Sequence, residues 1–217
     1  MYQYFYALPE EKQQRIRNAA FREFGKNGYK KTSTEQIAIA AGISKAMVFH
    51  YFRSKIGLFE YLFESGTTLI KNTYGNVHEQ LEGKDFIKQY QLLSEIKLKA
   101  MKELPELFEF FAMFYLREEN RQVSAKCVAL YEELIQFQQS VYSLVYKKNS
   151  HTPFRKDLPE DQLKNYISWL FEGYTSSLIA KIKETPFGET DFAPYWKEYF
   201  TMLTDLETLF YEPKEDV

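Results

Sequence analysis

The sequence predicts an all-α fold, and three observations lead to that prediction. Glycine and proline, which interrupt helices, are sparse at 9 and 7 of 217 residues. Apolar residues recur at spacings of three and four along most of the chain, which is the period of an amphipathic helix. Capping residues stand at the expected ends of these segments. We expect about nine helices and little or no sheet.

Capping residues place the first three helices. A proline at position 9 followed by two glutamates suits a first turn, because proline fixes φ and acids favour the positive end of the helix dipole. This helix is expected to end at Gly28 in a left-handed cap. Residues 33–36 (S-T-E-Q) form a capping-box pattern, which opens a short helix over 37–41 that ends at Gly42. Ser44 is then the N-cap of a third helix.

Six longer helices are predicted in the rest of the chain. Ser54 caps the first of them, which is expected to run towards residue 81 before a break at residues 83–84. The others are predicted at residues 85–103, 105–118, 121–148, 159–184 and 191–211, with a loop over residues 149–157.

Charge is distributed unevenly along the chain. The net charge is −2, but residues 1–60 carry 10 Lys and Arg against 5 Asp and Glu, whereas the remainder carries 18 against 25. Only the N-terminal part is therefore suited to a polyanion. No apolar run approaches the ~20 residues that span a bilayer, and the N-terminus lacks the pattern of a secretory signal. We expect a cytoplasmic protein with no membrane partner.

Metal, redox and enzyme chemistry find little support in the sequence. A single cysteine, Cys127, excludes an internal disulfide, and His50, His78 and His151 lie far apart without carboxylate-rich surroundings. Cys127 is interpreted as a small buried residue, with a redox sensor as the alternative. There is no Gly-rich phosphate loop and no nucleophile with a neighbouring base. We expect no metal, no cofactor and no enzyme activity.

Residues 37–52 predict two helices joined by a sharp turn. In the second helix, Val48 and Phe52 lie one turn apart on the inner face. The outer face carries Lys45, Ala46, Phe49 and His50, a set that core packing explains poorly. It suits the recognition helix of a helix-turn-helix, whose N-terminal residues enter the major groove of DNA.

The span from about residue 15 to residue 62 resembles the DNA-binding domain of the TetR family of bacterial transcription regulators. The matching segments are R-I-R-N-A-A-F-R-E-F-G-K-N-G-Y (15–29), K-T-S-T-E-Q-I-A-I-A-A-G-I-S-K (31–45) and V-F-H-Y-F-R-S-K-I-G-L-F (48–59). The resemblance implies an N-terminal helix-turn-helix domain, residues 1–55. It also implies a larger helical domain, residues 56–217, that dimerises and binds an effector.

The resemblance also implies which residues contact DNA. Thr32 and Ser33, at the start of the second helix, match phosphate-contacting positions, as do Tyr51 and Lys55. Positions that reach base edges or the sugar–phosphate backbone are matched by Lys45, Ala46, Met47, Phe49 and His50. For the two lysines and His50, the alternative is solvated surface without a specific contact.

Two positions depart from the family pattern, and the N-terminus is unusual. The family often has Gly or Pro where this chain has Ala46, and commonly Tyr where it has Phe49, so Phe49 is expected to make only apolar contact. The first eight residues are aromatic rather than basic. We therefore expect them to pack against the first helix or a neighbouring domain rather than enter a minor groove.

The last two predicted helices carry an apolar seam. In the final helix its residues are spaced 4, 3, 4, 3 and 4 apart from residue 192 to residue 210. Paired with a second chain, the two helices would form a four-helix bundle, the interface that the resemblance also implies. The alternative is that the seam packs inside one chain. The predicted interface residues are Leu163, Ile167, Leu170, Tyr174, Trp196, Tyr199, Leu203, Leu206 and Phe210.

The middle helices are rich in aromatic residues. One interpretation is an apolar ligand pocket with tyrosine hydroxyls as polar groups, and the other is an ordinary core. As a set they favour a hydrophobic or aromatic effector. The candidates are Phe108, Phe111, Phe114, Tyr115, Tyr131 and Tyr142.

The sequence thus predicts a homodimeric repressor that binds a palindromic operator in double-stranded DNA. Its two recognition helices would lie ~34 Å apart, about one DNA turn. A small effector is expected to release it from the operator. The alternatives are an activator or ligand-independent regulator of the same fold, and a helical protein-interaction module without DNA recognition.

Overall fold

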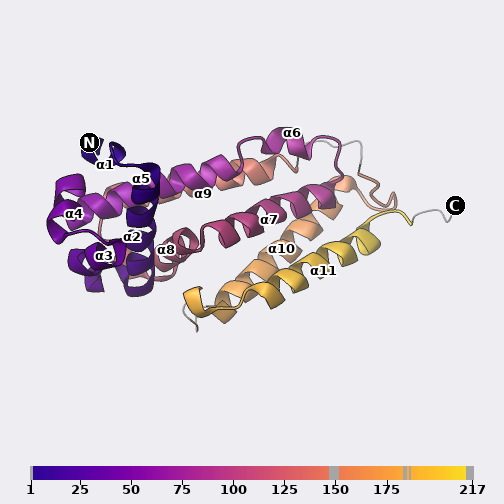
Figure 1. Ribbon diagram of the computed structural model, residues 1–217. Helices are drawn as coiled ribbons and strands as arrows, with labels where there is room; N and C mark the ends of the chain where they lie inside the picture. The colour runs from indigo at the N-terminus through magenta and orange to yellow at the C-terminus, as the bar shows by residue number, and fades with distance from the viewer. Residues whose placement is uncertain (1, 147–151, 183–184, 186, 214–217) are drawn as a thin grey trace. The chain divides into compact units, whose positions relative to one another are not determined.

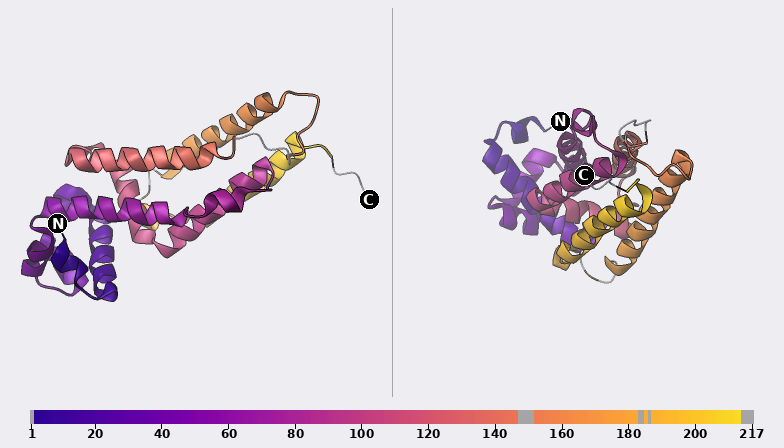
Figure 2. Two further views of the ribbon diagram at one scale, coloured as in Figure 1. Left: turned by 90° about the horizontal axis from the view of Figure 1, so that it is seen from above. Right: turned by 90° about the vertical axis from the view of Figure 1, so that its right-hand side faces the viewer.

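The computed structural model describes residues 2–146, 152–182, 185 and 187–213. In these residues the chain is helical, and the only extended pairing is an isolated bridge between Phe154 and Tyr211. Figures 1 and 2 show this arrangement of helices, which confirms the predicted all-α class. Within the same residues, no helix is both long enough and apolar enough to cross a bilayer.

The chain folds into two compact units, Met1–Thr73 with Ala100–Phe137, and Tyr74–Lys99 with Gln138–Val217. The first unit contains α1 (Gln3–Tyr6), α2 (Glu10–Lys31), α3 (Thr34–Ala41), α4 (Lys45–Phe52), α5 (Lys55–Thr73), α8 (Pro105–Leu116) and the 3₁₀ helix η1 (Glu118–Asn120). The second contains α6 (Val77–Leu81), α10 (Glu160–Ile182), η2 (Phe187–Glu189) and α11 (Ala193–Phe210). Two helices, α7 (Phe86–Glu103) and α9 (Ala125–Ser143), belong partly to each unit. The functional division predicted at residues 55 and 56 stays a prediction.

Several predicted boundaries were wrong. The helix expected from Ser54 to residue 81 is two helices, α5 and α6. The helix expected from residue 121 begins at Ala125, after Ser124, whose hydroxyl accepts from the N–H of Cys127 at 3.4 Å. Gly28 has the expected positive φ of 72°, but its ψ of 170° is not that of a left-handed cap, and helical turns resume as far as Lys31. Residues 149–151, including His151, and residues 183–184 lie outside the described residues.

Aromatic rings packed edge to face form the core of the first unit. The Phe59 ring lies 4.9 Å from that of Phe24 and 5.3 Å from that of Phe110, measured between centroids. Helix α8 approaches α5 closely at Gly66, where a Cβ atom would lie 2.7 Å from Cδ1 of Leu107. These contacts hold α8 within the same core as α2 and α5.

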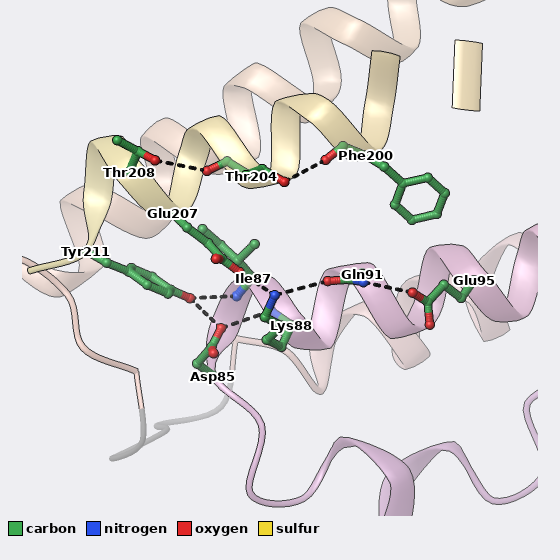
Figure 3. A network of polar contacts seen from close by, with 10 residues as sticks. All are labelled: Asp85, Ile87, Lys88, Gln91, Glu95, Phe200, Thr204, Glu207, Thr208 and Tyr211. Carbon is green, nitrogen blue, oxygen red and sulfur yellow. Dashed lines mark hydrogen bonds and ion pairs between the residues drawn. The ribbon is translucent and has the colours of Figure 1, made fainter. Parts of the chain in front are cut away.

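Polar contacts join the end of α11 to the start of α7 in the second unit (Figure 3). The Tyr211 hydroxyl donates to Oδ1 of Asp85 at 2.7 Å and accepts from the backbone N–H of Ile87 at 2.9 Å. One turn away, Lys88 and Glu207 form an ion pair at 2.8 Å. The buried backbone N–H at the start of α7 is therefore satisfied by a side chain from the C-terminal helix.

Cys127 is fully buried, and its environment favours the neutral thiol. Its side chain lies in α9 at 0% exposure, and burial raises the pKa of the thiol to about 12. Because thiolate is the reactive form, this residue behaves as a small apolar core residue, as the sequence suggested.

The N-terminal residues form α1, a helix that the sequence did not predict. Its Phe5 is fully buried, and the Phe5 ring lies 5.0 Å from the rings of both Phe52 and Tyr61. The side-chain amide of Gln13 donates to the carbonyl of Leu8 at 2.8 Å and so fixes the segment after α1. The aromatic N-terminus thus packs mainly against α4 and α5.

We predict that Phe5→Ala lowers the free energy of unfolding by about 3–5 kcal/mol, because it empties a buried aromatic site. Urea denaturation of the full chain measures this change. Gln3→Ala is the control, since Gln3 is exposed on the same helix. Equal midpoints for the two variants would show that α1 contributes nothing to the core.

Candidate nucleic-acid interface

Helices α3 and α4 form a helix-turn-helix whose ends are fixed by the predicted caps. Ser33 Oγ accepts from the N–H of Gln36 at 3.1 Å, and the Gln36 side chain accepts from the N–H of Ser33 at 2.8 Å. Gly42 adopts the left-handed conformation at φ 63° and ψ 40°. Ser44 Oγ accepts from the N–H of Met47 at 3.3 Å. Local hydrogen bonds therefore set the angle between the two helices.

Helix α4 divides into a buried face and an exposed face. Val48, Tyr51 and Phe52 are 0%, 4% and 2% exposed. The opposite face shows solvent Lys45, Ala46, Phe49 and His50, while Met47 is half-buried between the faces. Tyr51 was expected to contact phosphate. It is buried, and its ring centroid lies 5.9 Å from that of Phe5. A phosphate contact by Tyr51 stays a prediction.

The junction between α4 and α5 is tight. Arg53 has a positive φ of 65°, and the carbonyl of Phe52 accepts from the N–H of Ser54 at 2.8 Å. A Cβ atom on Gly57 would lie 2.3 Å from the same carbonyl oxygen, so only glycine fits there. This contact fixes the direction of α4 relative to α5.

Lys55 lies at the start of α5 and reaches back towards α2. Its ammonium nitrogen is 4.3 Å from the centre of the Tyr29 ring and 3.5 Å from the carbonyl oxygen of Lys30. Partial desolvation lowers the pKa of Lys55. The backbone N–H of Tyr29 donates to Oδ1 of Asn120 at 3.0 Å, and Asn120 is 2% exposed. No sequence signal could have joined these residues, because Tyr29 and Asn120 are 91 positions apart.

The two residues predicted to contact phosphate at the start of α3 differ in exposure. Thr32 is 2% exposed, and its hydroxyl lies 2.8 Å from the carbonyl oxygen of Gly28 and 2.9 Å from that of Glu23. Its side chain therefore stabilises the end of α2, and a contact with DNA stays a prediction. Ser33 is exposed, and its hydroxyl keeps a hydrogen to donate while it accepts the cap bond.

Lys45 forms an exposed ion pair with Glu35 of α3. The nitrogen–oxygen distance is 3.4 Å, and the two side chains are 54% and 65% exposed. Exposed pairs of this kind contribute little stability, so Lys45 can exchange its carboxylate partner for a DNA group at small cost.

The predicted pocket residues differ in burial, and two of the six lie in the core. Phe111 and Phe114 are 7% and 1% exposed, and the Phe114 ring lies 5.3 Å from that of Tyr131. Phe108 and Tyr131 are half-buried, and Tyr115 is on the surface. Tyr142 belongs to the second unit, whereas the other five belong to the first.

The predicted dimer seam is partly buried within a single chain. Leu163, Ile167, Leu203 and Leu206 are at most 3% exposed, so they have almost no surface left for a partner. Tyr199 accepts a hydrogen bond from Ser94 at 3.0 Å, and Tyr174, Trp196 and Phe210 are half-buried. In contrast, Leu170 is 45% exposed and its neighbour Trp169, which the seam pattern missed, is 62% exposed.

Residues 16–62 match the sequence pattern of the family described as bacterial regulatory proteins, tetR family. A curated relative, the uncharacterized HTH-type transcriptional regulator YvkB of Bacillus subtilis (strain 168), is 38% identical over 69 residues. That match covers 32% of this chain and 34% of YvkB. The sequence likeness to this relative therefore extends over about a third of its length.

Two solved structures resemble the whole chain. A candidate TetR-family transcriptional regulator from Mesorhizobium loti MAFF303099 is 19% identical with a TM-score of 0.60, and the match covers 94% of this chain and 98% of that one. A candidate transcriptional regulator from Saccharomonospora viridis, solved in complex with choline, is 17% identical with a TM-score of 0.61 and coverages of 94% and 100%. At this identity the likeness establishes the fold alone.

We predict that Glu35→Gln strengthens DNA binding about threefold, because it frees Lys45 and removes a negative charge from the exposed side of the helix-turn-helix. Fluorescence anisotropy with labelled duplex DNA measures this change. Glu10→Gln is the control, since Glu10 is also an exposed, ion-paired glutamate, 3.2 Å from Arg17, but lies on neither α3 nor α4. If both variants bind DNA equally, α3 does not face the DNA.

Proposed function

We propose that this chain, whose residues 16–62 match the pattern of the tetR family of bacterial regulatory proteins, is a sequence-specific DNA-binding transcriptional regulator. One observation supports the proposal most strongly. Helix α4 is held by three buried side chains and shows solvent a lysine, an aromatic ring and an imidazole. In the major groove, Lys45 would reach guanine acceptors, and Met47 or Phe49 would lie against a thymine methyl group.

The residues around α4 are suited to the phosphate backbone. Ser33, which precedes the recognition helix in the sequence, offers a hydroxyl, and Lys55, which follows it, offers an ammonium group. The basic character of residues 1–60 supports the same assignment, because neutralising phosphates drives association with DNA. Thr32 and Tyr51, both buried, would contribute by holding α3 and α4 in position.

The chain would act as a cytoplasmic homodimeric repressor. Two copies would place their recognition helices on a palindromic operator, with residues 1–55 binding DNA and residues 56–217 serving dimerisation and effector binding. It would need neither a cofactor nor catalysis. An activator or a ligand-independent regulator has the same structure, and the position of the operator relative to the promoter separates them.

The exposed face of α10 supports the dimer. Trp169 and Leu170 are well exposed, and Gly173 and Ser177, both small and exposed, follow on the same side of the helix at helical spacing. Large apolar and small residues on one face suit close packing against a second copy. The exposed face of α10, rather than the buried residues of the seam, would form the main contact between the two copies.

The effector would be hydrophobic or aromatic. The support is the aromatic composition of α8 and α9, whose tyrosines combine an apolar ring with a polar hydroxyl. Since Phe111 and Phe114 are buried in the core, the effector would meet the half-buried rings of Phe108 and Tyr131 first. To release DNA, it must bind the two states of the dimer with different affinity.

We predict different effects for the two lysines. Lys45→Ala should relax the preference at one base pair of each half-site, because a good side-chain contact to a base discriminates by about 1–3 kcal/mol. Lys55→Ala should weaken binding to all sequences alike and reduce the salt slope by about one unit for each DNA-binding domain. Binding to a panel of single-base variants at several salt concentrations measures both effects.

The control for both is Lys156→Ala, which removes an exposed lysine paired with Glu212 at 3.1 Å in the second unit. Its binding should equal that of the unmodified chain. If Lys45→Ala weakens every site equally, Lys45 does not contact bases.

We predict that Gly173→Glu converts dimers to monomers. In the described part of the chain, a Cβ atom at Gly173 meets no atom within 4 Å, so the new side chain fits the folded monomer. Burying its carboxylate against a second copy would cost about 3 kcal/mol or more, at least ~100-fold in affinity. Sedimentation equilibrium measures the change. The control is Thr175→Glu, at another exposed position of α10, which should remain dimeric. If Gly173→Glu associates as strongly as the unmodified chain, the dimer interface lies elsewhere.

A further inference from the structure

Helix α1 lies against the recognition helix, and its orientation is fixed by two buried residues. Tyr2 is 6% exposed and Phe5 is fully buried, with rings packed against Phe52 at 6.0 Å and 5.0 Å. Tyr4 lies between them in the sequence and is 64% exposed. A four-residue helix anchored at both ends therefore presents one tyrosine to solvent beside α4.

The Tyr4 ring pairs with His50 on the outer face of α4. The two ring centroids are 4.7 Å apart and the rings are inclined at 34°. Within the described residues, the Tyr4 hydroxyl has no hydrogen-bond partner. Tyr6 provides a contrast: it is 58% exposed, but its ring contacts Tyr2 and Tyr61 rather than α4's outer face.

An aromatic ring in contact with a polar imidazole is poorly explained by core packing here, since both residues are exposed. The contact places the two rings next to each other on the exposed surface, and each ring carries a hydrogen-bond donor, the phenol O–H of Tyr4 and a ring N–H of His50. Tyrosine has only two side-chain torsions, so little conformational entropy remains to be lost on binding. Two neighbouring hydrogen-bond donors on a rigid surface suit an oxyanion.

We propose that Tyr4 is a DNA-contacting residue and that, with His50, it binds a backbone phosphate at the edge of the major groove. The inference rests on the proposed function, which places α4 in that groove. The N-terminal residues of a recognition helix reach the base edges, so its later part, where His50 lies, flanks the sugar–phosphate backbone. Hydroxyl and ring N–H donors are common partners of phosphate oxygens. The aromatic N-terminus thus extends the DNA-binding surface without adding a basic arm.

The test compares Tyr4→Phe with Tyr6→Phe in the full chain. Each variant removes one exposed hydroxyl from α1 and keeps the ring, so packing is preserved. Tyr4→Phe should weaken binding to the selected operator about tenfold for each half-site, and so about 100-fold for the dimer, taking the low end for a hydrogen bond to a charged group. Tyr6→Phe should bind within about twofold of the unmodified chain. Because tyrosine is neutral, the salt slope should not change.

Ethylation interference identifies the contact itself. In the unmodified chain, ethylation of one phosphate per half-site should block binding, and Tyr4→Phe should lose sensitivity at that phosphate alone. Equal affinity and an equal interference pattern for Tyr4→Phe would overturn the assignment. If the unmodified chain selects no DNA sequence, the proposed function fails and the Tyr4 assignment fails with it; if it selects an operator that Tyr4→Phe binds equally well, only the Tyr4 assignment fails.

Discussion

The structure depends on how an eight-residue helix is held in place while one of its faces stays in water. Isolated helices below ~12–15 residues are marginal, so α4 derives its stability from tertiary contacts. Val48, Tyr51 and Phe52 are buried; the rings of Tyr51 and Phe52 pack against Phe5 of α1, and the Phe52 ring also packs against Tyr61 of α5. The close approach of Gly57 to the Phe52 carbonyl then fixes the direction of α4 relative to α5. The backbone positions of the residues on its outer face are therefore fixed as well.

Three polar side chains on or beside this face contact residues outside α4. Lys45 is paired with Glu35, the His50 ring lies against the Tyr4 ring, and Lys55, at the start of α5, lies over the Tyr29 ring. Asn120 extends these contacts to the segment after α8, because it accepts from the N–H of Tyr29 at the end of α2. Residues 100–137 therefore pack with the helix-turn-helix in one compact unit. A change in how α8 packs on α2 would reach the helix-turn-helix, and with it the proposed DNA-binding surface, through these contacts.

Local signals made much of this predictable from the sequence. Ser33, Gly42, Ser44 and Ser54 act through hydrogen bonds and dihedral angles within a few residues, and the structure has the caps where the sequence placed them. Features set by distant contacts were missed. Helix α1 is too short to show a period, and the Tyr29–Asn120 bond joins segments far apart in the chain. The seam was visible as an apolar face, but spacing alone could not tell whether its own chain or a second copy covers it. Burial assigns Leu163 and Leu203 to the chain's own core.

The most direct measurement is a selection from fragmented genomic DNA of the host, with the purified full-length chain at low salt and sequencing of the retained fragments. A homodimeric regulator with α4 in the major groove predicts enrichment of one or a few palindromic sites, with half-sites ~10 base pairs apart from centre to centre, and steep loss of retention as salt rises. Enrichment of an asymmetric single site would contradict the dimer. Folded protein that retains no sequence above background would contradict sequence-specific DNA recognition altogether.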